Sequence, residues 1–217
     1  MTDSATLRIN EIFFSLQGET NTVGLPTVFV RLTGCPLRCQ YCDTAYAFSA
    51  GELHSIRQVM NRVAEFKPSY VTVTGGEPLA QPDSLILLQM LCDVGYQVSL
   101  ETSGAMDVAG VDPRVCIILD IKTPGSAECD RNLESNIRLL KPTDQVKFVI
   151  CDRKDYEWSK AKVDQFDLRN RVREILFSPS FGQLPGRELA EWILADRLLV
   201  RMQLQMHKFL WGDTPGH

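Results

Sequence analysis

The stretch that decides the fold is Gly34-Cys35-Pro36-Leu37-Arg38-Cys39-Gln40-Tyr41-Cys42-Asp43-Thr44. It holds three of the seven cysteines of the chain, with the spacing Cys-x3-Cys-x2-Cys. The stretch lacks the fourth cysteine that would close a tetrahedral zinc site or complete a four-thiolate iron–sulfur cluster. Three thiolates on a cluster of four irons would leave one iron open to a substrate or cofactor. The spacing therefore indicates chemistry more than a structural metal site.

Two structural interpretations of these cysteines stay open at this point. A zinc site could take its fourth ligand from elsewhere in the chain, although zinc sites more often pair their cysteines as two Cys-x2-Cys motifs. A disulfide with one spare thiol is the other interpretation. The remaining cysteines show no metal-ligand spacing, and we interpret Cys92 and Cys116 among them as small buried apolar residues.

Length and charge narrow the class of protein. The chain has 217 residues and no linker rich in proline, glycine or serine, so we expect a single domain over residues 1–217. A net charge of -4 gives no electrostatic reason to expect a nucleic acid or an anionic membrane as partner. The first residues lack the features of a signal peptide, and no apolar run has the length of a membrane span. We therefore expect a cytoplasmic protein with a small-molecule partner and reduced thiols.

Runs of β-branched residues alternate with amphipathic runs along the chain. The expected strands are 7–14, 27–32, 70–74, 97–100, 115–119, 145–150 and 172–177. The expected helices are 55–66, with Ser55 as its cap, and 82–94, 131–140, 154–166 and 187–199. This alternation predicts a parallel sheet with helices packed outside it. A complete eight-fold barrel needs about 250 residues, so we expect an incomplete, laterally open β/α (TIM-like) barrel.

Polar residues recur where these strands end. They are Cys35, Glu77, Glu101, Asp120, Lys122 and Ser178. Because the carboxyl ends of barrel strands form the functional face of this architecture, their recurrence in order predicts one shared site.

Several short motifs together resemble the 7-carboxy-7-deazaguanine synthase family of the radical S-adenosylmethionine (SAM) superfamily. The cysteine spacing and Gly75-Gly76-Glu77-Pro78 are typical of the superfamily. The motifs that narrow the resemblance are Leu16-Gln17-Gly18-Glu19, Asp43-Thr44 and His207-Lys208. Arg31 and Glu101-Thr102-Ser103-Gly104 also belong to the resemblance. The resemblance covers nearly the whole chain.

The resemblance implies an activity and its cofactors. The family converts 6-carboxy-5,6,7,8-tetrahydropterin to 7-carboxy-7-deazaguanine with loss of ammonia, on the way to queuosine and other 7-deazapurines. It implies a 4Fe-4S cluster on Cys35, Cys39 and Cys42, SAM used catalytically, and Mg²⁺. It also implies a homodimer. Separately, we hypothesise an electron donor of the flavodoxin or ferredoxin type that docks near Arg38.

The resemblance also implies residue roles. Contacts to SAM are expected from Gly75, Gly76, Glu101, Ser103, Asp120, Lys122 and Ser178. Contacts to the substrate are expected from Leu16, Gln17, Gly18, Glu19, Arg31, Thr74, His207 and Asp213. The guanidinium of Arg31 suits the substrate carboxylate, and the hydroxyl of Thr44 suits Mg²⁺, with Asp43 behind it. No catalytic residue is expected beyond the cluster and SAM.

The chain departs from the family pattern in three places. Asp120-Ile121-Lys122 stands where some members carry Ser-Pro-Lys, and Ser178-Pro179 stands where some carry Gln-Pro. The chain also continues past His207-Lys208. We expect a substrate-binding tail over about residues 205–217, in which the Asp213 side chain replaces the terminal carboxylate of shorter relatives.

Two other functions compete with this interpretation. A radical SAM activase that abstracts hydrogen from a protein glycine shares the cysteine spacing, but a macromolecular target does not explain Arg31 or the segment before it. An iron–sulfur electron carrier or redox sensor would need a fourth ligand, and SAM would not change the spectrum of its cluster.

Overall fold

A nine-stranded mixed sheet forms the centre of the computed structural model, which describes residues 5–212, 214 and 216. The strands are β1 (Thr6–Leu16), β2 (Pro26–Leu32), β3 (Glu52–Ser55), β4 (Tyr70–Gly75), β5 (Gln97–Thr102), β6 (Cys116–Asp120), β7 (Gln145–Ile150), β8 (Glu174–Pro179) and β9 (Arg201–Met202). The helices are α1 (Ile56–Glu65), α2 (Ser84–Val94), α3 (Ser135–Leu139), α4 (Arg153–Gln165), α5 (Leu168–Arg171), α6 (Gly186–Ala195) and α7 (Met206–Trp211). Four short 3₁₀ helices lie in the loops, among them η1 (Ala45–Phe48) and η4 (Cys129–Arg131).

The strand order is β3-β1-β2-β4-β5-β6-β7-β8-β9, and the pairs from β2 to β9 are parallel as expected. The predicted first strand differs, because β1 pairs antiparallel with both β2 and β3. Only residues 17–25 connect β1 to β2. That connection is too short for the crossover of a dozen or more residues that a parallel pair needs.

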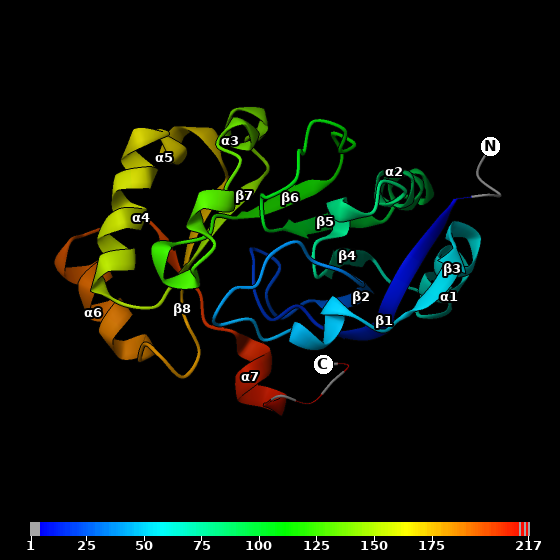
Figure 1. Ribbon diagram of the computed structural model, residues 1–217, viewed down its shortest axis with the longest axis horizontal. Helices are drawn as coiled ribbons and strands as arrows, with labels where there is room; N and C mark the ends of the chain where they lie inside the picture. The colour runs from blue at the N-terminus through cyan, green and yellow to red at the C-terminus, as the bar shows by residue number, and fades with distance from the viewer. Residues whose placement is uncertain (1–4, 213, 215, 217) are drawn as a thin grey trace.

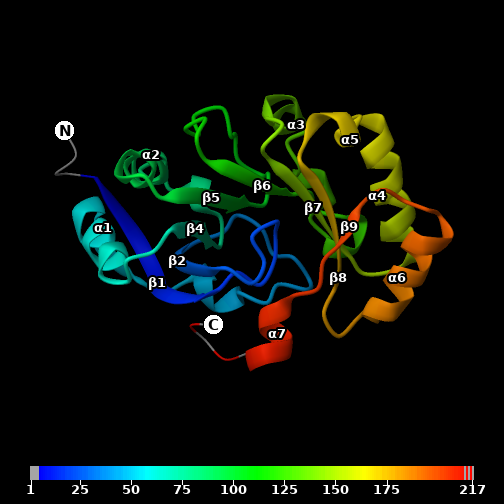
Figure 2. The ribbon, with the colours of Figure 1, turned by 180° about the vertical axis from the view of Figure 1, so that it is seen from behind.

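The sheet curves into a barrel that stays open (Figure 1). Within the described residues, no strand pairing joins β3 to β9, so the sheet does not close. Helices α1 to α6 lie outside the curve, whereas α7 lies apart from them on the inner side, and the view from behind shows the same arrangement (Figure 2). The predicted laterally open β/α barrel is therefore confirmed.

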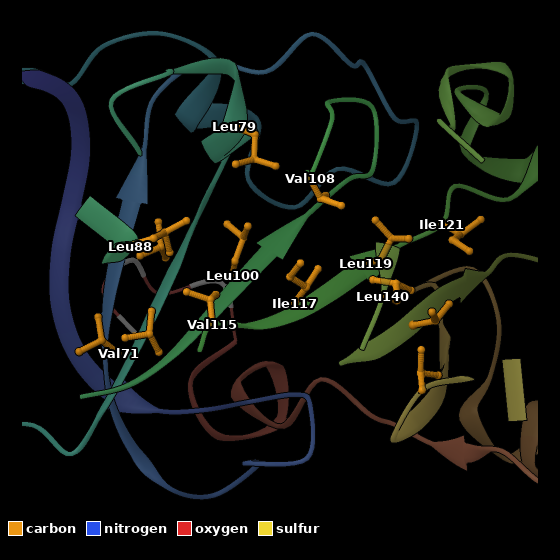
Figure 3. Packing of buried hydrophobic residues seen from close by; sticks show 14 of the residues in the cluster. Val71, Leu79, Leu88, Leu100, Val108, Val115, Ile117, Leu119, Ile121 and Leu140 are labelled. Atoms are coloured by element: carbon orange, nitrogen blue, oxygen red, sulfur yellow. The ribbon is translucent and has the colours of Figure 1, made fainter. Parts of the chain in front are cut away.

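The core lies between the convex face of the sheet and the outer helices. Alternate residues of β4, β5 and β6 point outward, and Leu100, Ile117 and Leu119 pack there, with Leu88 of α2 beside Leu100 (Figure 3). The opposite residues of the same strands point inward and include Thr74 and other polar side chains. A polar concave face on a parallel sheet is the feature that leaves room for a ligand.

Several elements differ from their predicted bounds, among them α6, which ends at Ala195 and not at Leu199. Local reasons explain two of these differences. The helix expected over residues 131–140 shortens to α3, because Asn132 is engaged elsewhere. Its amide nitrogen donates to the carbonyls of Lys122 and Cys129, and its amide oxygen accepts the Lys122 N–H. Strand β8 runs two residues further than expected, so Ser178 lies inside the strand.

Helix α1 begins at Ile56 and has Ser55 as its N-terminal cap, as predicted. The Ser55 hydroxyl accepts from the backbone of Gln58, whose side chain in turn accepts from the Ser55 N–H. None of the helices in the described part of the chain combines the length and apolar character that a membrane-spanning helix needs.

Candidate active site

A cavity of about 670 Å³ opens on the concave side of the sheet. Side chains from six strands, the cysteine stretch and α7 line it. Among the predicted site residues, the lining includes Leu16, Gln17, Gly18, Glu19, Arg31, Cys35, Cys39, Cys42, Thr44, Thr74, Gly75, Gly76, Glu101, Ser103, Asp120, Lys122 and His207. Residues distant in sequence therefore meet in one place, as expected from the ends of successive strands.

One predicted site residue within the described part of the chain, Ser178, does not belong to this lining. Ser178 is buried inside β8, and its hydroxyl has no hydrogen-bond partner among the described residues. Ser180 and Phe181 line the cavity instead, because β8 extends through Pro179 before the chain turns toward the cavity. Asp213 lies outside the described residues.

The three cysteines of the decisive stretch are half-buried at one end of the cavity. Burial raises the pKa of the Cys39 thiol to about 11, and Lys122 acts in the opposite direction. No group of three or more His, Cys, Asp or Glu side chains in the described ranges could hold a single metal ion. A four-iron cluster places each thiolate on a different iron. The three cysteines therefore fit such a cluster better than a mononuclear zinc site.

The loop after β4 supports the cysteine stretch through packing. A Cβ added to Gly76 would lie 2.2 Å from the carbonyl oxygen of Gly34 and 2.9 Å from the Cβ of Cys35. Gly75, with φ +143°, would likewise place a Cβ 2.3 Å from the carbonyl oxygen of Leu32. These contacts give both glycines a reason beyond the approach of a ligand, since a side chain on Gly76 would displace the cysteine stretch and one on Gly75 would displace the end of β2.

Glu77 connects this loop to the end of β5 through hydrogen bonds. Its fully buried carboxylate accepts from the backbone N–H of Leu79 at 3.1 Å and from the Thr102 hydroxyl at 2.9 Å. It also accepts from both the N–H and the hydroxyl of Ser103. Glu77 is therefore a structural cap, and the Ser103 hydroxyl already has a protein acceptor.

A buried ion pair lies beside the cysteines. Lys122 Nζ is 2.9 Å from Asp120 Oδ2 and 5.8 Å from the centre of the Tyr41 ring. Although burial alone would lower the pKa of Lys122, the charge of Asp120 raises it overall. This end of the cavity, defined by the three cysteines with Tyr41, Asp120 and Lys122, is called the cysteine end below.

The other end of the cavity contains a network of neutral donors. Gln17 Nε2 donates to Thr72 Oγ1 at 3.2 Å and to Glu101 Oε1 at 3.3 Å, and Gln17 Oε1 accepts from the Glu19 N–H. The Thr74 hydroxyl donates to Glu101 Oε2 at 3.0 Å. The predicted substrate residues Gln17 and Thr74 are thus bonded to Glu101, which the sequence interpretation placed against SAM.

Arg31 has a partner that the sequence interpretation missed. Its Nε donates to Glu11 Oε1 at 2.7 Å, and the Tyr46 hydroxyl donates to the same oxygen at 2.8 Å. The guanidinium also lies 5.7 Å from the centre of the Phe13 ring. Glu11 and Arg31 are directly opposite each other on β1 and β2. The pair would have been visible in the sequence only with the antiparallel register known.

Lys147 of β7 is the second missed residue. Its ammonium contacts Glu19 Oε2, and both side chains line the cavity. Although burial alone would lower the pKa of Lys147, the charges of Glu19 and Asp120 raise it overall, so this lysine stays protonated. One sequence feature could have identified Lys147 as a site residue, namely its place between the apolar residues Val146 and Phe148 in a predicted strand. A strand buried on both faces rarely carries a charge.

Replacing Lys147 with methionine should destabilise the fold, because Glu19 would keep a buried charge without its partner. We expect the free energy of unfolding in denaturant to fall by about 3 to 5 kcal/mol. The control is Lys162→Met, which breaks the more exposed pair with Glu134 and should cost about 0 to 1 kcal/mol. Equal losses in the two variants would contradict this account of the buried pair.

Helix α7 closes the cavity. The Met206 N–H donates to the Gly18 carbonyl at 3.0 Å, and Gln205 Nε2 donates to Asp43 Oδ2 at 3.2 Å. A Cβ added to Gly18 would lie 2.3 Å from His207 Nδ1. Because Gly18 has no side chain, the His207 ring of the tail can pack against its backbone. Burial lowers the pKa of His207, so its imidazole is neutral at pH 7.

Comparisons with known proteins show what the chain as a whole is similar to. The model of the Radical SAM superfamily matches residues 29–119. A 7-carboxy-7-deazaguanine synthase from Chlorobaculum tepidum is 46% identical over 220 residues, which cover 100% of both chains. One from Koribacter versatilis is 40% identical over 225 residues, covering 97% of this chain and 100% of that protein. These two relatives span the whole site, from the first strand to the tail.

Solved structures match the fold. The crystal structure of QueE from Escherichia coli aligns with a TM-score of 0.77 at 24% identity, covering 93% of this chain and 95% of that chain. Streptococcus suis SuiB bound to S-adenosylmethionine aligns with a TM-score of 0.57 at 16% identity, covering 79% of this chain and 44% of that chain. At these identities the two structures show the likeness of fold alone.

Proposed function

We infer the reaction of this cavity from the family of the chain. The chain belongs to the 7-carboxy-7-deazaguanine synthase family of radical SAM enzymes. The reaction is the conversion of 6-carboxy-5,6,7,8-tetrahydropterin to 7-carboxy-7-deazaguanine with loss of ammonia. One observation carries the inference: a single cavity joins three cysteines of cluster spacing to a polar end that contains Arg31, Glu19 and Glu101.

The cysteine end would hold the cofactors of this family. Cys35, Cys39 and Cys42 would bind three irons of a 4Fe-4S cluster, and SAM would bind the fourth. When bound, the reduced cluster and SAM supply the radical chemistry that removes a hydrogen atom from the substrate. We propose that Asp120 and Lys122 contact SAM, with Gly75, Gly76 and the Ser103 region forming the floor beneath it.

The polar end would hold the substrate. The Nε of Arg31 donates a hydrogen bond to Glu11. The two terminal nitrogens of Arg31 donate no hydrogen bond within the described residues, so they can bind the substrate carboxylate. Leu16, Gly18 and His207 would enclose the ring system, with Glu19 held in place by Lys147. Because these groups are buried or half-buried and are held in place before binding, a ligand that leaves the polar ones unpaired would be rejected.

Thr44 is the proposed protein ligand of Mg²⁺. Its hydroxyl lies in the cavity lining and donates to Asp43 Oδ1 at 3.1 Å, so an oxygen and a nearby negative charge are both present. A single protein oxygen suits a cation that keeps several waters and takes its other ligands from substrate.

The Thr44→Val variant tests the Mg²⁺ site. Loss of the only proposed protein oxygen should raise the Mg²⁺ concentration for half-maximal activity by about tenfold or more. The measurement is initial rate against Mg²⁺ after treatment with a chelator. Ser49→Ala, a change of similar size in the neighbouring loop away from the cavity lining, is the control. Identical Mg²⁺ curves for wild type and Thr44→Val would remove Thr44 from the site.

The enzyme needs a reductant, and we propose one of the flavodoxin or ferredoxin type. Arg38 supports a docking position beside the cysteines, because it is exposed and its guanidinium stacks 4.3 Å from the centre of the Phe48 ring. Arg38→Glu should lower activity with flavodoxin and leave activity with dithionite unchanged. A homodimer, a single-domain organisation and a cytoplasmic location stay predictions from the sequence.

The proposed reaction is tested in an anaerobic assay of the cluster-reconstituted protein. The mixture contains SAM, dithionite, Mg²⁺ and 6-carboxy-5,6,7,8-tetrahydropterin, and mass analysis follows 7-carboxy-7-deazaguanine. Its formation supports the proposal. Formation of 5'-deoxyadenosine alone would keep the radical SAM chemistry and reject the substrate, and no SAM cleavage by an intact cluster would favour the electron carrier.

A further inference from the structure

The loop between β1 and β2, residues 17–25, lies at the amino-terminal end of the barrel. It directly precedes β2, the first of the parallel strands, so it lies where those strands begin and not where they end. Its first residues nevertheless reach the cavity, since Gln17, Gly18 and Glu19 line it. The loop therefore forms part of the polar end, and its position determines where a substrate can lie.

Strand β7 holds this loop at two points. Lys147 contacts the Glu19 carboxylate, and Gln145, two residues earlier in the strand, binds Asn21. The Gln145 amide pairs reciprocally: its Oε1 accepts from the Asn21 N–H at 3.0 Å, and its Nε2 donates to Asn21 Oδ1 at 2.8 Å. Residues two apart in a strand point to the same face, so both β7 side chains meet the loop from the concave side.

The amide pair itself binds no ligand in the cavity. Gln145 is fully buried and Asn21 is half-buried, and neither side chain belongs to the cavity lining. Gln145 Nε2 also lies 3.5 Å from Cys116 Sγ, but sulfur is a weak acceptor. Asn21 is therefore the stronger partner of a buried amide that needs one. The pair can affect a ligand only through the loop that it holds.

The loop needs to be held because Thr20 is strained. This buried residue has φ +69°, in the left-handed region that β-branched residues rarely adopt. Its hydroxyl lies 3.0 Å from the Thr22 hydroxyl and accepts from the Thr22 N–H at 3.3 Å. Thr20 stands between Glu19 and Asn21, the two loop residues that β7 binds. A strained backbone persists only where its surroundings hold it, and here β7 holds it on both sides.

We propose that Asn21 and Gln145 are positioning residues for the substrate. Their amide pair keeps Thr20 in its strained conformation, and this holds Gly18 and Glu19 in place at the polar end. The inference rests on the proposed function, which places the substrate there. When the pair is broken, Thr20 relaxes and only a fraction of the molecules keeps the loop in its binding position. The apparent dissociation constant of the substrate then rises by the inverse of that fraction.

The test compares wild type with four variants as anaerobic holoenzymes. Asn21→Ala removes the acceptor of Gln145 Nε2, whereas Asn21→Asp keeps an acceptor oxygen at the same place. The double variant Thr20→Gly/Asn21→Ala relieves the strain after the pair is broken, because glycine adopts a positive φ without steric cost. Asn170→Ala is the matched control, since Asn170 is an exposed residue of α5 whose side chain donates to Asp167.

Two kinds of measurement are made on each protein. The first is the dissociation constant of pterin-6-carboxylate, which keeps the ring system and the carboxylate of the substrate, together with the KM for SAM in uncoupled formation of 5'-deoxyadenosine. The second is amide hydrogen exchange of residues 17–25 without ligand, followed by mass analysis. Hydrogen exchange reports release of the loop directly and does not depend on what the cavity binds.

Asn21→Ala should weaken binding of pterin-6-carboxylate by about 3- to 10-fold, which corresponds to the loss of one hydrogen bond. Exchange of residues 17–25 should become faster by a similar factor. The KM for SAM should stay within about twofold, because SAM binds at the cysteine end. Asn21→Asp and the double variant should recover most of the lost affinity, and Asn170→Ala should match wild type.

Any of three results would overturn the proposal. The first is unchanged pterin binding or unchanged exchange of residues 17–25 in Asn21→Ala. The second is a double variant that binds as weakly as Asn21→Ala, and the third is a KM for SAM that rises as much as the dissociation constant. Failure of the proposed function looks different. Wild type would then form no 7-carboxy-7-deazaguanine, while the difference in exchange between wild type and Asn21→Ala would persist.

Discussion

Replacing Cys39 with alanine is expected to abolish product formation and SAM cleavage. The cluster needs three protein thiolates, and only two would remain in the variant. Cys39 lines the cavity beside Lys122 and Asp120. We expect the variant to lose the visible absorption of the reconstituted cluster and to retain the secondary structure of wild type. Iron content, absorption and 5'-deoxyadenosine formation are measured on the same sample.

Cys116→Ala is the control for this loss. Cys116 begins β6, donates weakly to the carbonyl of Thr143 and does not line the cavity. The control should therefore keep its cluster and its activity. Two outcomes would contradict the assignment of the cysteine stretch. One is cluster absorption and SAM cleavage that persist in Cys39→Ala, and the other is an equal loss of both in Cys116→Ala.

Gly76→Ala is expected to have the second largest effect. The new methyl group would meet the Gly34 carbonyl at 2.2 Å and the Cβ of Cys35 at 2.9 Å, and backbone atoms cannot rotate away as a side chain can. Overpacking of this kind costs about 1 to 3 kcal/mol. A shift of about 1 Å in a catalytic arrangement can cost about 100-fold in rate. We therefore expect the free energy of unfolding in denaturant to fall by about 1 to 3 kcal/mol and the turnover rate to fall by about 100-fold.

Gly110→Ala separates this effect from a general cost of replacing glycine. A Cβ on the exposed Gly110 would meet Leu85 Cδ1 at 2.9 Å, which is the far end of a flexible, half-buried side chain. Stability should change by no more than about 0.5 kcal/mol and turnover should match wild type. A Gly76→Ala enzyme as active and stable as Gly110→Ala would show that the loop after β4 does not constrain Cys35.

The architecture was predictable because short-range sequence patterns determine it. Strand β7 begins and ends where the pattern of residues 145–150 predicts. The open barrel followed from the alternation of elements and the chain length, and the Ser55 cap from a local motif. Helix α3 was overestimated, because the side-chain bonds of Asn132 to distant backbone groups are invisible in a local pattern.

The site was predictable as a set of residues and less so as a set of contacts. The resemblance named the residues that line the cavity, but pairing depends on register and on strand direction. Glu11 became the partner of Arg31 only because β1 runs antiparallel to β2. Lys147 was missed because its partner Glu19 lies in a loop far away in sequence. Ser178 was misplaced because β8 continues past it.

The most direct test of the account is the ratio of product formed to SAM consumed. SAM bound at the cysteine end would share one cavity with the substrate, which would allow SAM to be regenerated after each turnover. In the anaerobic assay, wild type should form many molecules of 7-carboxy-7-deazaguanine for each SAM lost, with a rate that depends on the substrate. One SAM lost for each product, or SAM cleavage that the substrate does not affect, would contradict it.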